Sequence, residues 1–523
     1  MNKRMVSCIF LSLMIAFSVS GYSLMIGHDS KEGFNLVSFL LISVAFLPVT
    51  AMVYYVFDQM VGCYKLSKPE KATFFKFFLI SFFLVYLGLS VYHRAYNPAI
   101  MWWDSYYQIA QARGQIPYDN WHPLLTTLIF QGLLYIKNDI AFIVYVQMFL
   151  WSVLVSFIIA RLMTIYYNKW IFIAFIIFIL LPGQALYIVT ICKDAWFAIA
   201  TVWLAWLLVE RVTGILINEN FFMVEMIVAA SLATLTRTNG FFMAVAAVIV
   251  NCFFGKKSKT YLSLVIYAVA MVLWFGPILH SIPQVENSAG VKWLALADDA
   301  LNVYVSDGDM SNEMKDLVEH VYSQWDMDFR RSGEHAILGD YDYIENNVGA
   351  MRFVGLYLDM CLHNPKMWID GVLYRLSYLW DLERNHGVDS LIGITDYSQT
   401  IEGDSFKNWV PYSPRIETNS KRVMDYIVAV SMMPAVEKIV WRVAPWFLFM
   451  IAILLWAIQE KKWYWVLINL PVVFHVIGLA GCLLFRNHRY FWPIALWEAI
   501  LAVSFIWIEN KDNNKEIERI VDE

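Results

Sequence analysis

Asp104 is the residue of this 523-residue chain whose neighbours best suit acid–base chemistry. It lies in the run Met101-Trp102-Trp103-Asp104-Ser105-Tyr106-Tyr107. A carboxyl group held among aromatic side chains can have a raised pKa, so Asp104 could accept a proton from a hydroxyl nucleophile. It could equally help to hold a divalent metal ion, or be a solvated loop carboxylate beside a belt of interfacial aromatic residues.

Four further segments carry polar residues beside apolar runs, where a charge is costly and needs an explanation. They are Asp119-Asn120-Trp121-His122-Pro123-Leu124, Cys192-Lys193-Asp194, Leu235-Thr236-Arg237-Thr238-Asn239-Gly240 and Phe485-Arg486-Asn487-His488-Arg489-Tyr490-Phe491-Trp492-Pro493.

The first two of these segments each admit a functional and a structural interpretation. His122 could contact a substrate or be an interfacial histidine, and Asp119 is expected to cap the helix that follows. Lys193 could meet a phosphate while Asp194 meets a hydroxyl or a metal ion. The same two residues could instead form an ion pair at the membrane rim, which contributes little.

The last two segments carry arginines, whose planar fork of donors suits phosphate. Arg237 could bind a phosphate or extend to the lipid headgroups. Arg486 and Arg489, followed by Tyr490, lie where few cations are expected, so an anion nearby would explain them. A substrate phosphate and a lipid headgroup explain them almost equally well.

The motifs of soluble nucleotide chemistry are absent from the sequence. It contains no Walker loop, no G-x-G-x-x-G, no H-E-x-x-H and no G-x-S-x-G. One loop carboxylate, several phosphate-seeking cations and many apolar runs together favour an enzyme whose lipid-linked phosphate substrate is presented in the bilayer.

Composition places the chain in a membrane. Hydrophobic residues make up 59% of it and charged residues only 16%, against about 25% in soluble domains. The six cysteines form no C-x-x-C pair, so neither a zinc site nor a disulfide framework is expected. No dense block of Lys and Arg occurs, and we expect no nucleic acid partner.

The fold class expected is an all-α polytopic membrane protein with about twelve to thirteen transmembrane helices. The expected spans are 5–26, 34–57, 74–93, 140–160, 170–190, 195–209, 221–235, 241–254, 261–280, 441–458, 463–485 and 490–508. The apolar piece 124–136 is expected to be too short to cross. The positive-inside tendency then puts both termini in the cytoplasm and all five polar segments outside.

Charge divides the chain into parts. Residues 281–440 hold 25 Asp and Glu against 13 Lys and Arg, a balance of −12 that leaves +7 for the rest. We therefore expect an N-terminal transmembrane module (1–280) with an outer catalytic loop (94–121). An acidic extracytoplasmic insert (281–440), C-terminal transmembrane helices (441–510) and a cytoplasmic tail (511–523) should follow.

The order of the polar segments resembles the GT-C superfamily of membrane glycosyltransferases, above all the lipid A aminoarabinose transferases and protein O-mannosyltransferases. There an acidic residue in the first outer loop precedes an H-P-P-L segment, which here reads His122-Pro123-Leu124-Leu125 without the second proline. Lys193-Asp194 is similar to the R-P-D-like turn of those enzymes. Thr236–Gly240 resembles their T-K-G-P-like helix end, and Arg489–Pro493 their R-Y-x-x-P element.

The resemblance implies transfer of a sugar from a polyprenyl-phosphate carrier to an acceptor on the outer face of the cell membrane. Asp104 would be the base or metal holder, and Arg237, Lys193, Arg486 and Arg489 would be candidates for the carrier phosphate. The acceptor would be a cell-envelope glycan, lipid or protein. The one cofactor to consider is a divalent cation, Mg²⁺ or Mn²⁺, on Asp104 or Asp194.

Three other functions compete with this one. A polysaccharide polymerase or ligase also uses lipid-linked sugars, but would depend on outer-loop arginines more than on Asp104. A lipid or sugar transporter (flippase) would show related halves and ionisable residues near the membrane midplane, and the sequence indicates charges at helix ends instead. A membrane scaffold with a binding insert would leave the outward basic turns unexplained.

Overall fold

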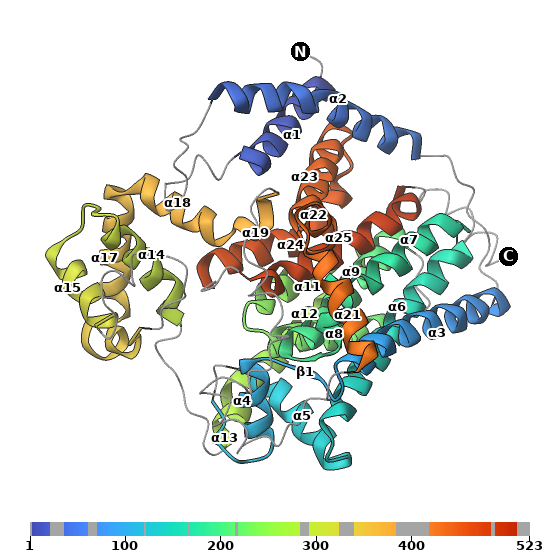
Figure 1. Ribbon diagram of the computed structural model, residues 1–523, viewed down its shortest axis with the longest axis horizontal. Helices are drawn as coiled ribbons and strands as arrows, with labels where there is room; N and C mark the ends of the chain where they lie inside the picture. The colour runs from blue at the N-terminus through green and yellow to red at the C-terminus, as the bar shows by residue number, and fades with distance from the viewer. Residues whose placement is uncertain are drawn as a thin grey trace.

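The computed structural model describes residues 3–20, 36–60, 71–119, 122–165, 167–214, 218–282, 292–323, 339–382, 418–482 and 487–509. In these ranges the chain is helical apart from two very short strands and the turns. Most helices gather around one apolar core, and a smaller helical lobe lies to one side (Figure 1). The expected all-α polytopic architecture is confirmed at this level.

Before the insert, the order of elements alternates long helices with short polar connections. The elements are α1 (Lys3–Ser20), α2 (Leu36–Met60), α3 (Lys71–Ala95), β1 (Ile100–Met101), α4 (Trp103–Ala112), α5 (Leu124–Ile136), α6 (Ile140–Ile165), α7 (Lys169–Leu180), α8 (Pro182–Ile188), β2 (Thr190–Ile191), α9 (Lys193–Thr213), α10 (Glu219–Thr236), α11 (Gly240–Phe254), α12 (Lys257–Leu273), the π-helical turn η2 (Trp274–Ile278) and α13 (Leu279–Ser281).

The insert and the C-terminal part follow. Their elements are α14 (Leu294–Val305), α15 (Asn312–Val321), the π-helical turn η4 (Ile344–Val348), α17 (Ala350–His363), α18 (Pro365–Arg375), α19 (Ser377–Trp380), α21 (Asn419–Ser431), α22 (Pro434–Val440), α23 (Ala444–Gln459), α24 (Trp463–Cys482) and α25 (His488–Glu509).

Within the described residues, eight helices are long and apolar enough to cross a membrane. Two further spans result if each of two sharply bent pairs, α7 with α8 and α22 with α23, is one crossing. Each segment expected to cross contains a helix. Helix α11 has the expected bounds to within one residue but, with 15 residues, is short for a crossing, and α1 is described as far as Ser20. The apolar piece 124–136 is the 13-residue helix α5, about 20 Å long at 1.5 Å per residue and so too short to cross.

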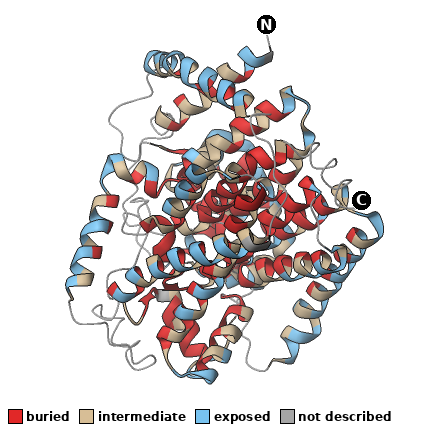
Figure 2. Cartoon of the chain, turned by 90° about the vertical axis from the view of Figure 1, so that its right-hand side faces the viewer, coloured by how far each residue is buried: buried red, intermediate tan, exposed pale blue. Residues whose placement is uncertain are grey.

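Helices α9 and α25 form the centre of the molecule. They pack against each other, and nearly all of their side chains are buried. Figure 2 shows that buried residues gather at the centre of the molecule. Helices α2, α3 and α12, in contrast, expose large apolar side chains such as Leu41, Leu87 and Val272. A surface of this kind suits contact with lipid, whereas α9 and α25 are surrounded by protein.

Glu498 and His475 are buried ionisable residues in the middle of apolar helices, contrary to the expectation that charges keep to helix ends. Glu498 lies halfway along α25, is fully buried, and both of its carboxyl oxygens lack a hydrogen-bond partner among the described residues. His475 is likewise buried inside α24, where its Nε2 lies 3.2 Å from the carbonyl oxygen of Tyr490. Hydropathy does not reveal such residues, because a single polar residue hardly changes the mean hydropathy of a long apolar segment.

The acidic insert has two structurally different parts. Residues between Leu294 and Cys361 enclose a small apolar core of their own. Residues from Leu376 onward, including Tyr378 and Val440, pack into the main core. A buried ion pair between Arg375 of α18 and Asp299 of α14 joins α18 to the separate lobe, and Arg375 also donates to the carbonyl oxygen of Ala480 in α24.

Polar clusters mark the side of the molecule expected to face the cytoplasm. Arg4 contacts Asp58 and Glu460, and the guanidinium group of Arg211 forms an ion pair with Glu219. The first group joins the start of α1 and the end of α2 to the residue that follows α23, and the second joins the end of α9 to the start of α10.

The orientation of the chain can be tested by cysteine accessibility. In a variant without the six native cysteines, Ser306→Cys in the insert should react with a membrane-impermeant maleimide on intact cells. Ser258→Cys in α12 should react only after the membrane is permeabilised, since it lies in the basic turn Lys256–Lys259. Labelling of Ser258→Cys on intact cells would reverse the topology.

Candidate functional site

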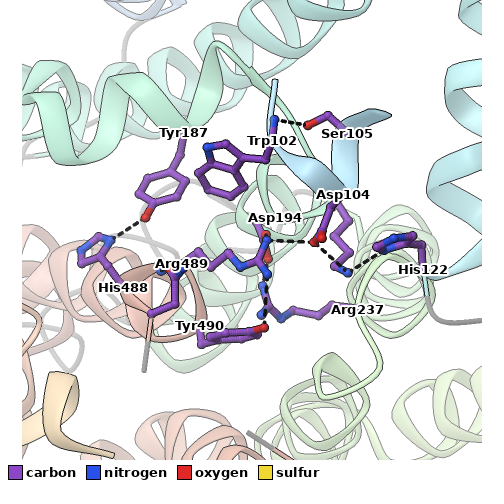
Figure 3. Close-up of polar contacts among 12 residues, drawn as sticks. Trp102, Asp104, Ser105, His122, Tyr187, Asp194, Arg237, His488, Arg489 and Tyr490 are labelled. Carbon is purple, nitrogen blue, oxygen red and sulfur yellow. Dashed lines mark hydrogen bonds and ion pairs between the residues drawn. The ribbon is translucent and has the colours of Figure 1, made fainter. Parts of the chain in front are cut away.

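Asp104 lies at the start of helix α4 and is in contact with two cations from distant parts of the chain. Its carboxylate oxygen Oδ2 is 2.9 Å from Nη1 of Arg489 and 3.4 Å from Nζ of Lys193 (Figure 3). The side chains of all three residues are 12–14% exposed. The structure thus brings three of the predicted site residues together in a position that solvent can reach.

A two-stranded parallel sheet explains how Asp104 and the Lys193-Asp194 turn meet. Strand β1 pairs with β2 in the register Met101 to Ile191, and each strand leads directly into a helix, α4 or α9. Asp104 and Asp194 therefore occupy equivalent positions, three residues past paired residues. The hydroxyl of Ser105 donates to the carbonyl oxygen of Ile191 and so ties the start of α4 to β2.

His122 joins the group from the segment that precedes α5. Its Nδ1 is 3.0 Å from Nζ of Lys193, so the imidazole accepts a hydrogen bond from the ammonium group. The carboxylate of Asp119 accepts a bond from the backbone N–H of His122 at 3.4 Å. The expectation that Asp119 caps α5 is wrong, because the N-cap residue is Pro123 and Asp119 holds the turn before it.

Asp194 and Arg237 form the buried floor of the site. Their side chains are in direct contact and only 1% and 3% exposed. Arg237 also donates from Nε to Oδ1 of Asn239 at 2.8 Å, and its guanidinium group lies 4.5 Å from the centre of the Tyr490 ring. Asp194 is 3.9 Å from Nη1 of Arg489, which links the floor to the exposed residues above it.

Arg489 lies between two aromatic rings. Its guanidinium carbon is 5.3 Å from the centre of the Trp102 ring and 5.1 Å from that of Tyr490, and Nη2 donates to the Tyr490 hydroxyl at 3.3 Å. Its Nε is buried without a hydrogen-bond partner among the described residues. The rings fix the guanidinium plane and leave one donor for a further acceptor.

The electrostatics correct the expectation for Asp104. Burial raises the pKa of its carboxyl group, but Arg489 and Lys193 lower it more, so the pKa lies well below its usual range. A raised pKa was expected from the aromatic neighbours, and that prediction is wrong because the chain fold adds cations that the local sequence does not contain. Asp104 is therefore ionised at neutral pH.

The cluster carries a surplus of positive charge. Burial, together with the neighbouring Lys193, lowers the pKa of His122 to about 3, so the imidazole is neutral at pH 7. Burial also lowers the pKa of Arg237, to about 10, and this side chain remains charged. Three cations against two carboxylates leave a net charge of +1.

Helix termini add to this positive potential. Asp104, Lys193 and Arg489 each lie within the first two residues of a helix, α4, α9 and α25, and Arg237 is three residues before the start of α11. Helix N-termini carry partial positive charge and favour anions. Cations at such ends are disfavoured unless an anion is close, so the arrangement suits an anionic ligand better than it suits the cations alone.

The donor set does not fit a divalent cation. Asp104 and Asp194 are each in contact with a guanidinium group, and the surplus positive charge would repel Mg²⁺ or Mn²⁺. Among the described residues, no three His, Cys, Asp or Glu side chains converge as metal ligands would. No chemical step is therefore assigned to a metal ion.

The structure adds residues that the sequence did not single out for the site. His488 stacks on Tyr187 with ring centres 5.5 Å apart, and its Nδ1 is 3.3 Å from the Tyr187 hydroxyl. The Tyr187 ring in turn lies edge-on to Trp102. No periodicity marks Tyr187, since it lies within an apolar run. Arg486, also predicted for the site, lies outside the described residues.

All the other predicted site residues, namely Asp104, His122, Lys193, Asp194, Arg237, Arg489 and Tyr490, belong to this one cluster. Each of these residues lies at the end of a helix or in the turn that precedes one. Comparisons with protein-family models, with curated proteins and with solved structures find no match to the chain.

Proposed function

We propose that this protein is a membrane glycosyltransferase that transfers a sugar from a polyprenyl-phosphate carrier to an acceptor hydroxyl at the outer face of the cell membrane. The observation that carries the proposal is the partly exposed carboxylate of Asp104, held beside Arg489 and Lys193 in a cluster with a net positive charge. In such a cluster the cations can bind a phosphate while the carboxylate accepts a proton from a nucleophile.

The cations account for the donor. Arg489 and Lys193 are exposed enough to touch a ligand, whereas Arg237 is buried against Asp194. The carrier phosphate would accept hydrogen bonds from Arg489 and Lys193, and Arg237 would keep Asp194 and Tyr490 in position. Stabilising the leaving phosphate as its negative charge grows is the contribution expected of such preorganised cations.

The carboxylate accounts for the acceptor. In the proposed step, the acceptor oxygen forms a bond to the anomeric carbon of the sugar while the bond from that carbon to the phosphate oxygen breaks. The phosphate leaves with the electron pair, and the proton of the acceptor hydroxyl passes to Asp104. The products are the glycosylated acceptor and the polyprenyl phosphate.

Donor binding would also activate the base. The pKa of Asp104 is held low by Arg489 and Lys193, and a carboxylate paired with two cations is a weak proton acceptor. A bound phosphate would share those cations and supply negative charge nearby, and both effects raise the pKa of Asp104. The carboxylate would then be most basic when the sugar is present.

The direct test is an assay of the purified full chain, in lipid, against a panel of polyprenyl-phosphate and polyprenyl-diphosphate sugars. Release of polyprenyl phosphate from one monosaccharide donor, with the sugar found on an acceptor or in water, would support the proposal. Turnover only of diphosphate-linked oligosaccharides would indicate a polymerase or ligase. Movement of the lipid across a vesicle without chemical change would indicate a flippase.

Substitution of Glu498 can distinguish the glycosyltransferase hypothesis from the transporter hypothesis. It is the kind of mid-span carboxyl group on which proton-coupled transporters depend. It lies nine residues beyond Arg489 on α25, about 13 Å along the helix at 1.5 Å per residue. For a glycosyltransferase, Glu498→Gln should leave sugar transfer within about threefold of wild type, measured by initial rates in lipid nanodiscs. Movement of the lipid across a vesicle that is lost in Glu498→Gln would favour the transporter.

A further inference from the structure

Helix α4 carries a row of polar side chains that extends away from Asp104. Gln108 and Gln111 follow Asp104 by four and seven residues, so the three share one face of the helix. The two glutamines are 0% and 1% exposed. Both atoms of each amide group are buried without a hydrogen-bond partner among the described residues, although an amide offers two donors and an acceptor.

The helix packed against α4 also carries buried polar groups without a partner. Helix α5 packs against α4, and its Thr126 and Thr127 are buried with hydroxyl groups that have no partner in the described part of the chain. A helical threonine can return its hydroxyl to the carbonyl oxygen four residues earlier, and neither residue does so. Buried polar groups are ordinarily paired, so a concentration of unpaired ones between two helices points to a bound partner.

A cavity of about 270 Å³ lies at the end of this row. It is lined by Gln111, Gly114, Gln115, Ile116, Pro117 and Tyr118. Gln111 is one of the lining residues, its amide group is buried, and the Tyr118 hydroxyl is positioned by its bond to Oε1 of Gln131 at 3.2 Å. The left-handed Gly114 has open space where a side chain would lie. The cavity therefore combines neutral hydrogen-bonding groups with flat apolar surfaces.

We infer that this cavity and the row of amides bind a neutral, hydroxyl-rich ligand, namely the saccharide end of the acceptor. The assignment rests on the proposed function, which supplies the reason for an acceptor at this place. A sugar hydroxyl both donates and accepts hydrogen bonds, as an amide does, and the Tyr118 ring and Pro117 suit the apolar face of a pyranose ring.

Charge and distance separate this site from the donor site. None of the described residues that line the cavity is charged, so they offer a phosphate no counter-charge, whereas Arg489 and Lys193 lie at Asp104. From Asp104 to Gln111 the helix rises about 10 Å at 1.5 Å per residue. A saccharide of two rings reaches over that distance, with its reducing or non-reducing hydroxyl at the carboxylate and its other ring in the cavity.

Direct binding tests the inference without any donor. The probes are cellobiose, maltose and N,N′-diacetylchitobiose, with glucuronic acid as the anionic counterpart. The full chain is placed in lipid nanodiscs free of glycoside detergent, because detergent sugars would compete. We expect at least one neutral disaccharide to bind, and Gln111→Leu to weaken its binding at least tenfold. Glucuronic acid should bind more weakly than the neutral probes, and Asn138→Leu, at an exposed site on the same side, should leave binding unchanged.

The stability of the unliganded variant supplies the second readout. Gln111→Leu removes unpaired buried polar atoms, so its apparent Tm should equal or exceed that of wild type. Failure of every neutral probe to bind, or a Gln111→Leu variant that binds as wild type does, would overturn the inference. A lowered apparent Tm with unchanged binding would identify the amide as purely structural and would overturn it too.

The outcomes distinguish this inference from the proposed function. If saccharide binding depends on Gln111 but the protein turns over no lipid-linked sugar, the saccharide site is supported and the proposed transferase activity is contradicted. If the protein transfers sugar and its acceptor KM is the same in wild type and Gln111→Leu, the transferase activity is supported and the role of the cavity as acceptor site is contradicted. In a transferase with this acceptor site, Gln111→Leu should raise the acceptor KM at least tenfold while donor hydrolysis by water stays unchanged.

Discussion

Asp104→Asn is expected to reduce sugar transfer by about 10²–10⁴-fold, the contribution typical of a general base. The amide nearly preserves the size of the side chain but cannot accept the proton of the acceptor hydroxyl. Initial rates at saturating donor and acceptor measure the effect. Since Arg489 and Lys193 no longer share a carboxylate in this variant, its donor affinity should equal or exceed that of wild type.

Asp119→Asn is the matched control, in the same connection between α3 and α5. Asp119 accepts a bond from the backbone N–H of His122, and an Asn side-chain oxygen can accept the same bond. We expect this variant to retain activity within a fewfold of wild type. If Asp104→Asn keeps more than about a tenth of wild-type turnover, the loss expected of a general base is missing. The glycosyltransfer mechanism would then be wrong, and the polymerase and transporter hypotheses would move ahead of it.

The second large effect is expected for Arg489→Gln, which should weaken binding of the lipid-linked donor. Arg489 is partly exposed, and a guanidinium group can form two charge-assisted bonds to a phosphate. Hydrogen bonds to charged groups contribute about 1.5–3 kcal/mol, which corresponds to about 10- to 150-fold in affinity. Arg489→Lys should retain part of it, because an ammonium group supplies the charge but not the fork. Titration of nanodiscs with a polyprenyl-phosphate sugar measures the Kd.

Arg94→Gln tests whether the effect is specific. Arg94 is an exposed cation at the end of α3, on the side expected to face outward. If attraction to anionic lipid were the role of these arginines, the two substitutions would weaken binding alike. Donor affinity that is the same in wild type and Arg489→Gln, with both proteins folded, would assign Arg489 to holding Asp104 instead.

Arg237, which the sequence placed among the phosphate ligands, forms a buried ion pair with Asp194, so substituting it is a poor test of phosphate binding. Removing one member of a buried ion pair leaves an uncompensated charge and is destabilising by about 3–5 kcal/mol. Loss of activity in Arg237→Ala therefore does not distinguish a phosphate ligand from a fold contact, whereas Arg489 offers that distinction because of its exposure.

Much of the architecture follows from local sequence. The positions of the apolar helices are set by hydropathy over about 20 residues, because only such lengths of helix satisfy their own backbone in lipid. Helix α5 has the expected bounds because Pro123 precedes it and its apolar run is short. Polar residues at helix ends are similarly recognisable, since a charge there is unusual enough to need a reason.

The sequence by itself therefore determined an all-helical membrane protein and the ends of helices where its polar groups gather. It also marked Asp104, Lys193, Asp194, Arg237 and Arg489 as the groups that need an explanation. Only the tertiary structure decided which of them touch. The parallel register of β1 and β2 brings residues 90 positions apart into equivalent places, and the packing of α25 against α9 adds Arg489 from the far end of the chain. The low pKa of Asp104 and the burial of Arg237 follow from these long-range contacts, because Coulomb interactions depend on distance in space and not on separation along the chain.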